Sequence, residues 1–293
     1  MRGDAKARLQ FVADQCPLPW CPVPSLHHTR WYAEWQNLPG TYTLEPDGYT
    51  VTVFKTRLVS WYRSFTDSPP VRPPQTSLLT FHEWLPRYQL LRTPGWHRFG
   101  NVYTWAYAKL HPEYLKDWNQ QARRHLKVFQ KSGARLRLGT KADVEQVYAV
   151  SQVPKHMQKS MLDVLDKQLA THPETIDILV AEKSGQAIAC YVAGHCDEAK
   201  LSEYIIGAFH PHFAKDQAMV GLIDWWYQRA LARGHESLTF GHMEAPGRLP
   251  ASGDGYSVFK TNFGVQRWWL PINHWRVYFS HKWTSPIKPT ELK

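Results

Sequence analysis

The order in which strand and helix patterns follow one another between residues 135 and 279 constrains the fold of this chain most. After a first strand, Thr140 and Asp143 stand at the spacing of a capping box, which predicts that a helix begins there. Apolar spacing in the segments that follow predicts helices near 141–151, 155–170 and 216–233, and strands near 176–183, 186–195, 200–208, 236–240 and 265–279. This order predicts an α/β (α+β) domain with one mixed, mostly antiparallel sheet flanked by helices.

The first half of the chain is less regular. Prolines in residues 1–30 preclude a helix there, so we predict an extended arm. Residues 49–55 alternate and are β-branched, which predicts a strand, whereas the proline-rich residues 68–74 are typical of a loop. We therefore expect an arm (1–30), an N-terminal subdomain (31–134) that ends in a basic helix, and a C-terminal domain (135–293).

The net charge of the chain narrows the range of partners. Lys+Arg 35 against Asp+Glu 25 gives a formal charge of +10, which favours tRNA, a lipid pyrophosphate or an anionic membrane surface. No run of about 18 apolar residues is present. The first ten residues also lack the apolar core of a secretory signal, so we expect a cytoplasmic protein.

The cysteines do not indicate a metal site. The chain has four of them, at spacings of four and five intervening residues rather than as Cys-x-x-Cys pairs. Free thiols are therefore the better interpretation for Cys16, Cys21, Cys190 and Cys196. We expect neither a metal nor a cofactor.

Positive charge is densest between residues 109 and 141, where nine Lys and Arg residues stand against two carboxylates. Apolar residues at steps of three and four from Glu113 to Lys131 predict a helix here. Cations at steps of four share one helix face and repel one another unless an anion binds, so this face either binds tRNA or phosphate or is simply solvated. It has few aromatics for reading bases, and we expect no DNA partner. The predicted tRNA or phosphate ligands are Arg123, Arg124, Lys127 and Lys131.

One short segment resembles a known family. Residues 255–264, Gly-Tyr-Ser-Val-Phe-Lys-Thr-Asn-Phe-Gly, place a lysine and aromatics between glycines. They resemble the Phe-Lys-x-x-Phe-Gly signature of the FemAB-like transferases, a branch of the GNAT-like acyltransferases that attaches amino acids from aminoacyl-tRNA to peptidoglycan precursors. Residues 209–241 look like the same family's loop, helix, glycine, strand and Phe-Gly sequence. The resemblance implies a GNAT-like fold, with room for a truncated second GNAT-like unit in the first half.

The resemblance also implies catalytic residues. It places Lys260 close to the transfer site, where the lysine would stabilise an oxyanion; a surface lysine on a strand edge is the alternative. GNAT enzymes often use a carboxylate on a central strand as base, and Glu203 is the nearest candidate, with Tyr204 as acid or hydrogen-bond donor. An exposed glutamate on a strand is the alternative.

Substrate contacts are expected from three segments. Phe259 and Tyr256 belong to the signature, and Phe259 is also predicted to point into the core from a strand, together with Phe263. Lys155 stands where the family carries a Thr-x-x-Arg-like element for the acceptor, although lysine lacks the guanidinium fork. His212 could shuttle protons, or it could be a turn residue.

The loop before helix 216–233 bears on the donor. GNAT enzymes that use coenzyme A need a glycine-rich turn at this helix N-terminus. Residues 212–221 lack that turn, and Asp216, a candidate helix cap, would repel phosphate. We therefore expect an aminoacyl-tRNA or another acyl donor, and an amine acceptor such as a peptidoglycan precursor. The alternatives are a GNAT N-acyltransferase with a thioester donor and a non-catalytic RNA-binding protein of the same fold.

Overall fold

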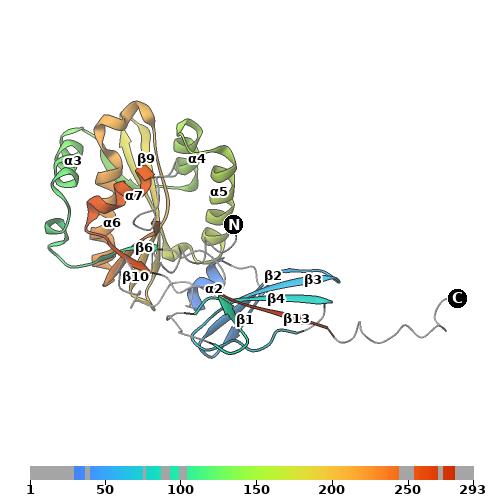
Figure 1. The fold of residues 1–293 in the computed structure, drawn as a ribbon. Coiled ribbons are helices and arrows are strands. Elements are labelled where there is room, and N and C mark those ends of the chain that lie inside the picture. Colours follow the sequence, from blue (N-terminus) through green and yellow to red (C-terminus); the bar gives the residue numbers. More distant parts are fainter. Residues whose placement is uncertain are drawn as a thin grey trace, which may run out of the picture. The chain divides into compact units, whose positions relative to one another are not determined.

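The computed structural model describes residues 30–36, 40–74, 77–86, 93–98, 104–243, 254–269 and 273–280. The chain divides into two compact units, one formed by residues 1–103 and 269–293 and the other by residues 104–268 (Figure 1). This division does not coincide with the boundary expected after residue 134, because the basic helix belongs to the second unit. Residues 1–29 of the predicted arm lie outside the described part of the chain, and Arg30 begins a helix.

The first unit is built on a six-stranded sheet. In sheet order its strands are β1 (Tyr42–Glu45), β2 (Gly48–Lys55), β3 (Val59–Thr66), β4 (Leu79–Trp84), β13 (His274–Phe279) and β5 (His97–Arg98). β2 confirms the strand predicted over 49–55. Neighbouring strands are antiparallel except for β3 and β4, which are parallel. Helix α2 (Arg30–Gln36) buries Ala33 with Tyr49 and Phe65 of this sheet.

The last strand in the described part of the chain, β13, joins this unit, which corrects one prediction. The sequence predicts that residues 265–279 complete the GNAT-like sheet, but only β12 (Gln266–Trp269) does so. β13 pairs with β4, and Val277 lies opposite Phe81. The pattern that predicts a strand is local, whereas the partner of a strand depends on the path of the whole chain. β13 therefore does not belong to the sheet of the C-terminal domain that was expected over residues 135–293.

The second unit holds a seven-stranded sheet in the order β12-β6-β11-β10-β9-β8-β7. The pairs with a described register are antiparallel except for β10 and β11, which are parallel, so the predicted mixed, mostly antiparallel sheet is confirmed. β6, which lies before the basic helix, was not predicted. The further strands are β6 (Thr104–Lys109), β7 (Arg135–Leu138), β8 (Ile176–Lys183), β9 (Gln186–Cys196), β10 (Leu201–Phe209) and β11 (Ser237–Met243).

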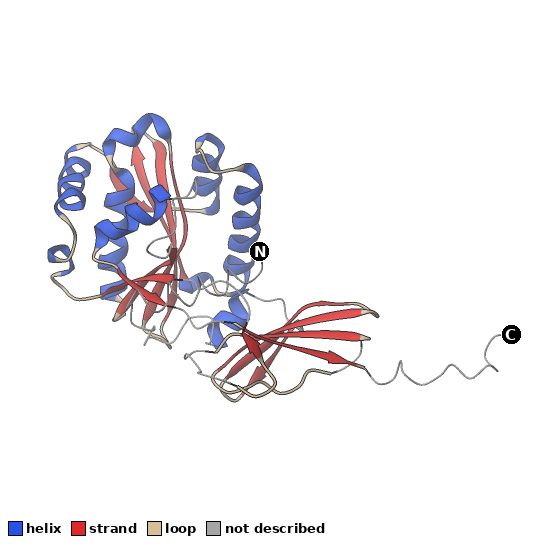
Figure 2. Cartoon of the chain, in the orientation of Figure 1, coloured by secondary structure: helices blue, strands red, loops and turns tan. Residues whose placement is uncertain are grey.

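Helices cover both faces of this sheet (Figure 2). On one side lie α4 (Lys141–Val150) and α5 (Lys155–Thr171), and on the other α3 (Gln120–Lys131), α6 (Ala218–Ala232) and α7 (Asp254–Lys260). The predicted capping box begins α4, where the Asp143 carboxylate accepts a hydrogen bond from Thr140 N at 2.7 Å. α6 is buried along most of its length against β8, β9 and β10.

Two helices begin later than the sequence predicts. Residues 114–116 form a separate 3-10 helix, and α3 starts after Asn119, whose side chain accepts a hydrogen bond from Ala122 N at 2.8 Å. The cap at Asn119 interrupts a pattern that otherwise looks continuous. α6 follows Gln217, which has a φ of 55° and takes the cap position predicted for Asp216. Asp216 pairs instead with Lys183, at 2.7 Å.

The basic helix α3 packs closely on α6. A Cβ atom at Gly221 of α6 would lie 2.2 Å from the Phe129 ring of α3, so only glycine permits this approach. Phe129 and Leu126 of α3 are buried in the same core as α6. The two helices thereby fix the basic face of α3 beside the beginning of α6.

Candidate active site

The signature segment is helical. α7 ends at Lys260 and is followed by a 3-10 helix, Thr261–Phe263, so the strand predicted for Phe259 and Phe263 is wrong. Residues four apart share a face in a helix as well, and the two phenyl rings lie 4.9 Å apart. Phe263 is buried in the core, and Phe259 is half-buried at the wall of a cavity.

Three contacts hold the signature segment in place. Phe263 packs edge-on against Trp118, with ring centroids 4.9 Å apart, and the Tyr227 hydroxyl donates a hydrogen bond to the Phe263 carbonyl at 2.6 Å. Gly264 has a φ of 69°, and a Cβ atom there would lie 2.7 Å from Cβ of Asp117. Glycine is therefore required at this position by both conformation and space. The end of α7 is fixed against the core, and Lys260 with it.

Lys260 is 1% exposed, which rules out the surface-lysine alternative. Its ammonium donates a hydrogen bond to the carbonyl of His242 in β11. The register of β11 shifts between Thr239 and His242, and Gly241 within this bulge has a φ of 70°. Burial lowers the pKa of Lys260 to about 7, against the opposing effect of the Glu203 carboxylate.

Glu203 is also buried, so the exposed-glutamate alternative is wrong. It lies on β10 opposite Thr239, at the last residue pair that joins β10 to β11. Burial raises the pKa of Glu203 to about 8, and the positive charge of Lys260 opposes that shift. Within the described part of the chain, Glu203 Oε2 has no hydrogen-bond partner. An unsatisfied buried carboxyl oxygen is rare in a purely structural residue.

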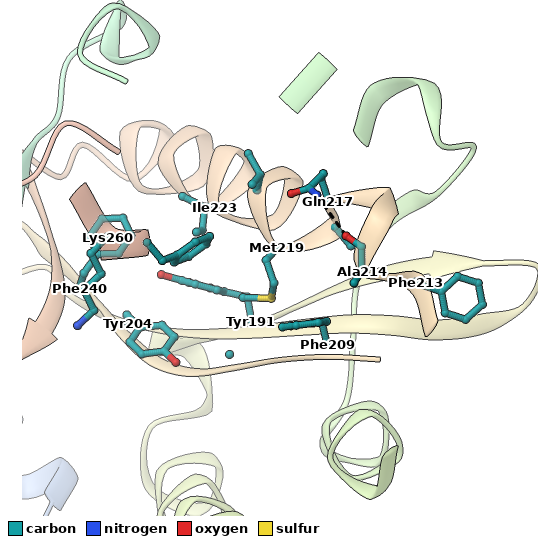
Figure 3. A pocket seen from close by; sticks show the side chains of 14 residues that line it. Tyr191, Tyr204, Phe209, Phe213, Ala214, Gln217, Met219, Ile223, Phe240 and Lys260 are labelled. Atoms are coloured by element: carbon teal, nitrogen blue, oxygen red, sulfur yellow. Dashed lines mark hydrogen bonds between the residues drawn. The ribbon is translucent and has the colours of Figure 1, made fainter. Parts of the chain in front are cut away.

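An apolar cavity of about 400 Å³ lies where β10 and β11 have parted. The two strands pair only over Leu201–Glu203 and Ser237–Thr239, although both continue beyond. Figure 3 shows Lys260, Tyr204 and Phe240 at one end of the cavity, and Phe213, Ala214 and Gln217 at the other. The lining is completed by Tyr191, Gly207, Phe209, Ala218, Met219, Val220, Ile223 and Phe259.

Two of the three residues predicted to be catalytic line the first of these ends, and the third, Glu203, does not line the cavity. Tyr204 and Lys260 line the cavity, and the Tyr204 ring lies 5.2 Å from that of Tyr191. Glu203 precedes Tyr204 on β10 and interacts electrostatically with Lys260. The fold thus brings together a basic, an acidic and a phenolic group from β10 and α7.

A basic groove of about 950 Å³ lies beside α3. Arg123, Arg124 and Lys127 line it, together with Lys215 from the loop before α6. Lys131, the fourth predicted ligand, is exposed but does not line the groove. None of these cations forms an ion pair with a carboxylate among the described residues. Gln217 lines both the groove and the apolar cavity, so the two adjoin.

Among the described residues, two further predicted substrate contacts, Lys155 and His212, do not line the cavity. Lys155 begins α5 and lies near Gln158, 3.4 Å from its Oε1, and His212 is exposed, with its ring 5.1 Å from that of Phe213. The side chain of Tyr256 lies outside the described part of the structure. Close to Lys155, a second cavity of about 230 Å³ shares Gly207 and Phe209 with the first, and its other lining residues are Ser151, Gln152, Val153, Ala208 and Pro211.

Most of the cavity wall was not predicted. Tyr191 and Phe240 have the pattern of ordinary core residues, and Met219 and Ile223 belong to the apolar stripe of a helix. Gln217 is a lining residue that the sequence could have indicated, because it directly follows Asp216 in the loop that was considered for phosphate binding. The Lys183–Asp216 ion pair also weakens the argument that Asp216 would repel phosphate, since the Asp216 charge is neutralised.

Within the described ranges, no group of His, Cys, Asp and Glu side chains could hold a metal ion, and no helix is long and apolar enough to cross a membrane. Cys190 and Cys196 are both buried, and burial raises the pKa of Cys190 to about 12. A thiol with a raised pKa is a poor nucleophile. The predicted free Cys16 and Cys21 lie outside the described residues.

Comparison with known proteins shows the fold. No family model and no curated protein matches the sequence. Among solved structures, FemX is similar at a TM-score of 0.65 and 8% identity, over 95% of this chain and 96% of that one. Two further structures are similar. L-PGS from Bacillus licheniformis has a TM-score of 0.51 and 11% identity, over 94% of this chain and 92% of that one. A conserved protein of unknown function from Bacteroides thetaiotaomicron VPI-5482 has a TM-score of 0.50 and 7% identity, over 82% of this chain and 85% of that one. The chain has a GNAT-like fold of the kind seen in FemX.

Proposed function

We propose that this chain is a FemAB-like transferase that forms an amide between an activated aminoacyl or acyl group and an amine acceptor. The observation that carries the proposal is the buried Lys260, which lines one end of an apolar cavity and is coupled electrostatically to the buried Glu203, while the other end of the cavity adjoins a basic groove. The fold shared with FemX and the Phe-Lys-x-x-Phe-Gly segment both support it. The basic groove suits the phosphates of a polyanionic donor, and the adjoining apolar cavity suits its acyl terminus.

In the proposed reaction the acceptor amine attacks the carbonyl carbon of an aminoacyl ester. A C–N bond forms, and the carbonyl electron pair moves onto oxygen. Collapse of this oxyanion breaks the C–O bond and releases the ribose oxygen as a hydroxyl group. The amine loses one proton and the leaving oxygen gains one, so the site needs to supply no net proton.

Three residues have roles in these steps. Protonated Lys260 stabilises the oxyanion, which can be worth two to three orders of magnitude in rate. Ionised Glu203 accepts the amine proton, and the Tyr204 hydroxyl hydrogen-bonds the leaving oxygen. Most of the remaining acceleration comes from holding an already activated ester beside the amine.

We assign the donor and the acceptor to opposite sides of this centre. Aminoacyl-tRNA would lay its phosphates along Arg123, Arg124 and Lys127 and extend its acyl terminus past Gln217. The acceptor, an amine such as that of a peptidoglycan precursor, would enter by the second cavity near Lys155, which meets the first at Gly207. A tRNA-borne donor places the reaction in the cytoplasm.

The test is transfer from a pool of aminoacyl-tRNAs to hydroxylamine, followed by mass spectrometry of the hydroxamates. Lys260→Met should reduce the rate about 100-fold or more, since it removes the oxyanion donor. Lys159→Met, at a side chain that is 80% exposed, is the matched control and should not change the rate. A folded Lys260→Met variant with wild-type turnover would exclude the role of Lys260. tRNA binding without transfer would favour the non-catalytic alternative.

One observation supports a second candidate. Because Lys183 neutralises Asp216, the loop before α6 is less repulsive to a pyrophosphate than its sequence implies. An acyl thioester could then be the donor instead of an ester. Acylation of amines by acyl-coenzyme A, with no activity toward aminoacyl-tRNA, would establish this alternative.

A further inference from the structure

The wall of the apolar cavity restricts what can occupy it. Aromatic rings come from five elements: Tyr191 from β9, Tyr204 and Phe209 from β10, Phe240 from β11, Phe259 from α7 and Phe213 from the 3-10 helix Pro211–Asp216. Met219, Val220 and Ile223 of α6 close the opposite side. Such a lining stabilises an apolar occupant through burial and ring contacts.

The charges of the cavity exclude a cationic occupant. Among the described lining residues, Lys260 is the only one with a charged side chain, and no carboxylate lines the wall. Glu203 interacts electrostatically with Lys260 but does not line the cavity, and Asp216 is paired with Lys183. An ammonium or guanidinium group would therefore lose its water without gaining a counter-ion, and burying an unpaired charge is costly.

Part of the cavity wall packs closely at a glycine. A Cβ atom at Gly207 would lie 3.0 Å from Met219 Cε and 3.0 Å from Tyr204 Cε2, so the side chains across the cavity already approach this position closely. The space next to Gly207 is therefore already occupied, and the free volume belongs to the rest of the cavity. At about 400 Å³ it is far larger than a methyl or hydroxymethyl group requires.

We infer that the transferred group has a large uncharged side chain, aromatic or branched aliphatic, that lies in this cavity while the donor's phosphates lie in the basic groove. The inference rests on the proposed function and names its substrate class. Small aminoacyl groups would leave the cavity largely unfilled, and cationic ones would be rejected. Phenylalanyl and leucyl donors are the simplest members of the accepted class.

Stable donor mimics provide the test. In aminonucleosides the amino acid is joined to the 3′-amino group of adenosine by an amide, so they bind without reacting. Titration calorimetry on the full chain should show the phenylalanine and leucine mimics binding at least about tenfold more tightly than the lysine mimic, a difference of about 1.4 kcal/mol. The alanine mimic should also bind more weakly than both.

A charge introduced at the cavity should invert this order. Phe209 lines the cavity and is 44% exposed, so Phe209→Glu should fold while it places a carboxylate at the wall. This variant should bind the lysine mimic more tightly than wild type and the phenylalanine mimic more weakly. Leu138→Glu, at an exposed residue of β7 away from the cavity, is the matched control and should keep the wild-type order.

The possible results separate the inference from the proposed function. Equal or tighter binding of the lysine or alanine mimic by wild type, or no binding of any mimic, overturns the inference. The proposed function fails differently: the mimics bind in the expected order and Phe209→Glu inverts it, but wild type transfers nothing from phenylalanyl-tRNA to hydroxylamine. Transfer of alanine or lysine alone would leave the function standing and overturn the inferred class.

Discussion

At the scale of single residues, the site depends on two ionisable groups that burial affects in opposite directions. Desolvation favours the neutral form of each, so the pKa of Lys260 falls and that of Glu203 rises until both lie near neutrality. Each charge also stabilises the other. Of the forms with one proton on the pair, only the one with charged Lys260 and ionised Glu203 can stabilise an oxyanion and accept a proton, and the population of that form sets the activity.

The first prediction concerns the pH dependence of transfer. kcat/KM should follow a bell-shaped profile with limbs near the pKa values of about 7 and about 8. In Glu203→Gln the carboxylate that favours charged Lys260 is gone, so the pKa of Lys260 falls further and the alkaline limb moves to lower pH. The rate profile should be measured with an acceptor amine that does not titrate in this range.

Glu145→Gln is the control for this experiment. Glu145 is half-exposed on α4 and pairs with Lys141, so its loss should leave both limbs in place. An alkaline limb that stays fixed, or moves to higher pH, in Glu203→Gln would contradict the coupling between Glu203 and Lys260.

A second prediction at this scale concerns Gly264, which ends the signature segment. Gly264→Ala should lower the free energy of unfolding by about 2 to 4 kcal/mol, because it combines a left-handed conformation with a contact of 2.7 Å to Asp117. Gly133→Ala is the matched control, with a φ of 76° and no atom within 4 Å of the added Cβ. It should cost only about 1 kcal/mol. Equal urea midpoints for the two variants would show that the contact with Asp117 is easily relieved.

At the scale of elements, the packing of α3 places its cations along the basic groove. Its buried residues pack on α6 through Gly221, and its exposed cations lie along a groove that reaches the beginning of α6. Lys215 adds a cation from a different element. Cations from α3 and from the loop before α6, two segments distant in sequence, thus line the same groove. A helix face that is only solvated does not require a second segment to add a cation beside it.

The third prediction tests this groove. The variant Arg123→Glu, Arg124→Glu, Lys127→Glu should weaken tRNA binding and flatten its dependence on salt, by about 0.7 to 0.9 in log–log slope for each phosphate that the variant no longer binds. Filter binding over a range of salt concentrations measures both. A control that reverses Lys116, Lys159 and Lys167, all exposed, changes the net charge equally and should keep the slope.

Two results would contradict the prediction. If wild type binds no tRNA at low salt, or if both triple variants lower affinity alike, the groove has no specific part in binding. If the groove variant instead loses sedimentation with anionic vesicles while its tRNA affinity is unchanged, the partner is a membrane surface.

At the scale of the whole molecule, a buried ionic cluster away from the active site ties β8 and β9 to α6. Asp177 accepts hydrogen bonds from Arg229 Nε at 2.5 Å and pairs with His195 Nε2 at 2.9 Å. His195 stacks on His235, with ring centroids 5.3 Å apart. Burial and, to a smaller extent, the neighbouring His195 together lower the pKa of His235 to about 4. Arg233 lies 3.6 Å from Asp177, and Asp197 lies 3.7 Å from His235.

The fourth prediction is therefore that acid destabilises the second unit. His235 stays neutral when folded but takes up a proton below its ordinary pKa of 6.5 when unfolded. The contribution of neutral His235 to the free energy of unfolding is present in full above pH 6.5. It is lost as the pH falls toward 4, and the loss is about 3 kcal/mol at most. Urea titrations between about pH 7.5 and 4.5 measure this loss, and His235→Phe should reduce it. An unfolding free energy that is constant over this range would contradict the prediction.

Much of the second unit could be predicted from the sequence, because the evidence is local. Helical and strand periodicity and the Thr140 capping box each depend on a few neighbouring residues, and the structure confirms these elements. The choice of Lys260 and Glu203 followed from a motif and its expected place in a GNAT-like order. Both residues proved to be buried and coupled.

Only the tertiary structure decided what those residues meet. The sequence pattern of β13 is that of a strand and would suit either sheet. The path of the folded chain decides that β13 pairs with β4 of the first unit. Phe259 and Phe263 point the same way in a strand or a helix, so spacing alone could not reveal that α7 is helical. The link from the basic groove to the cavity through Gln217, and the proximity of Lys260 to Glu203, join segments far apart in sequence. Sequence determines such local preferences, whereas burial and contact between distant groups arise only when the chain has folded.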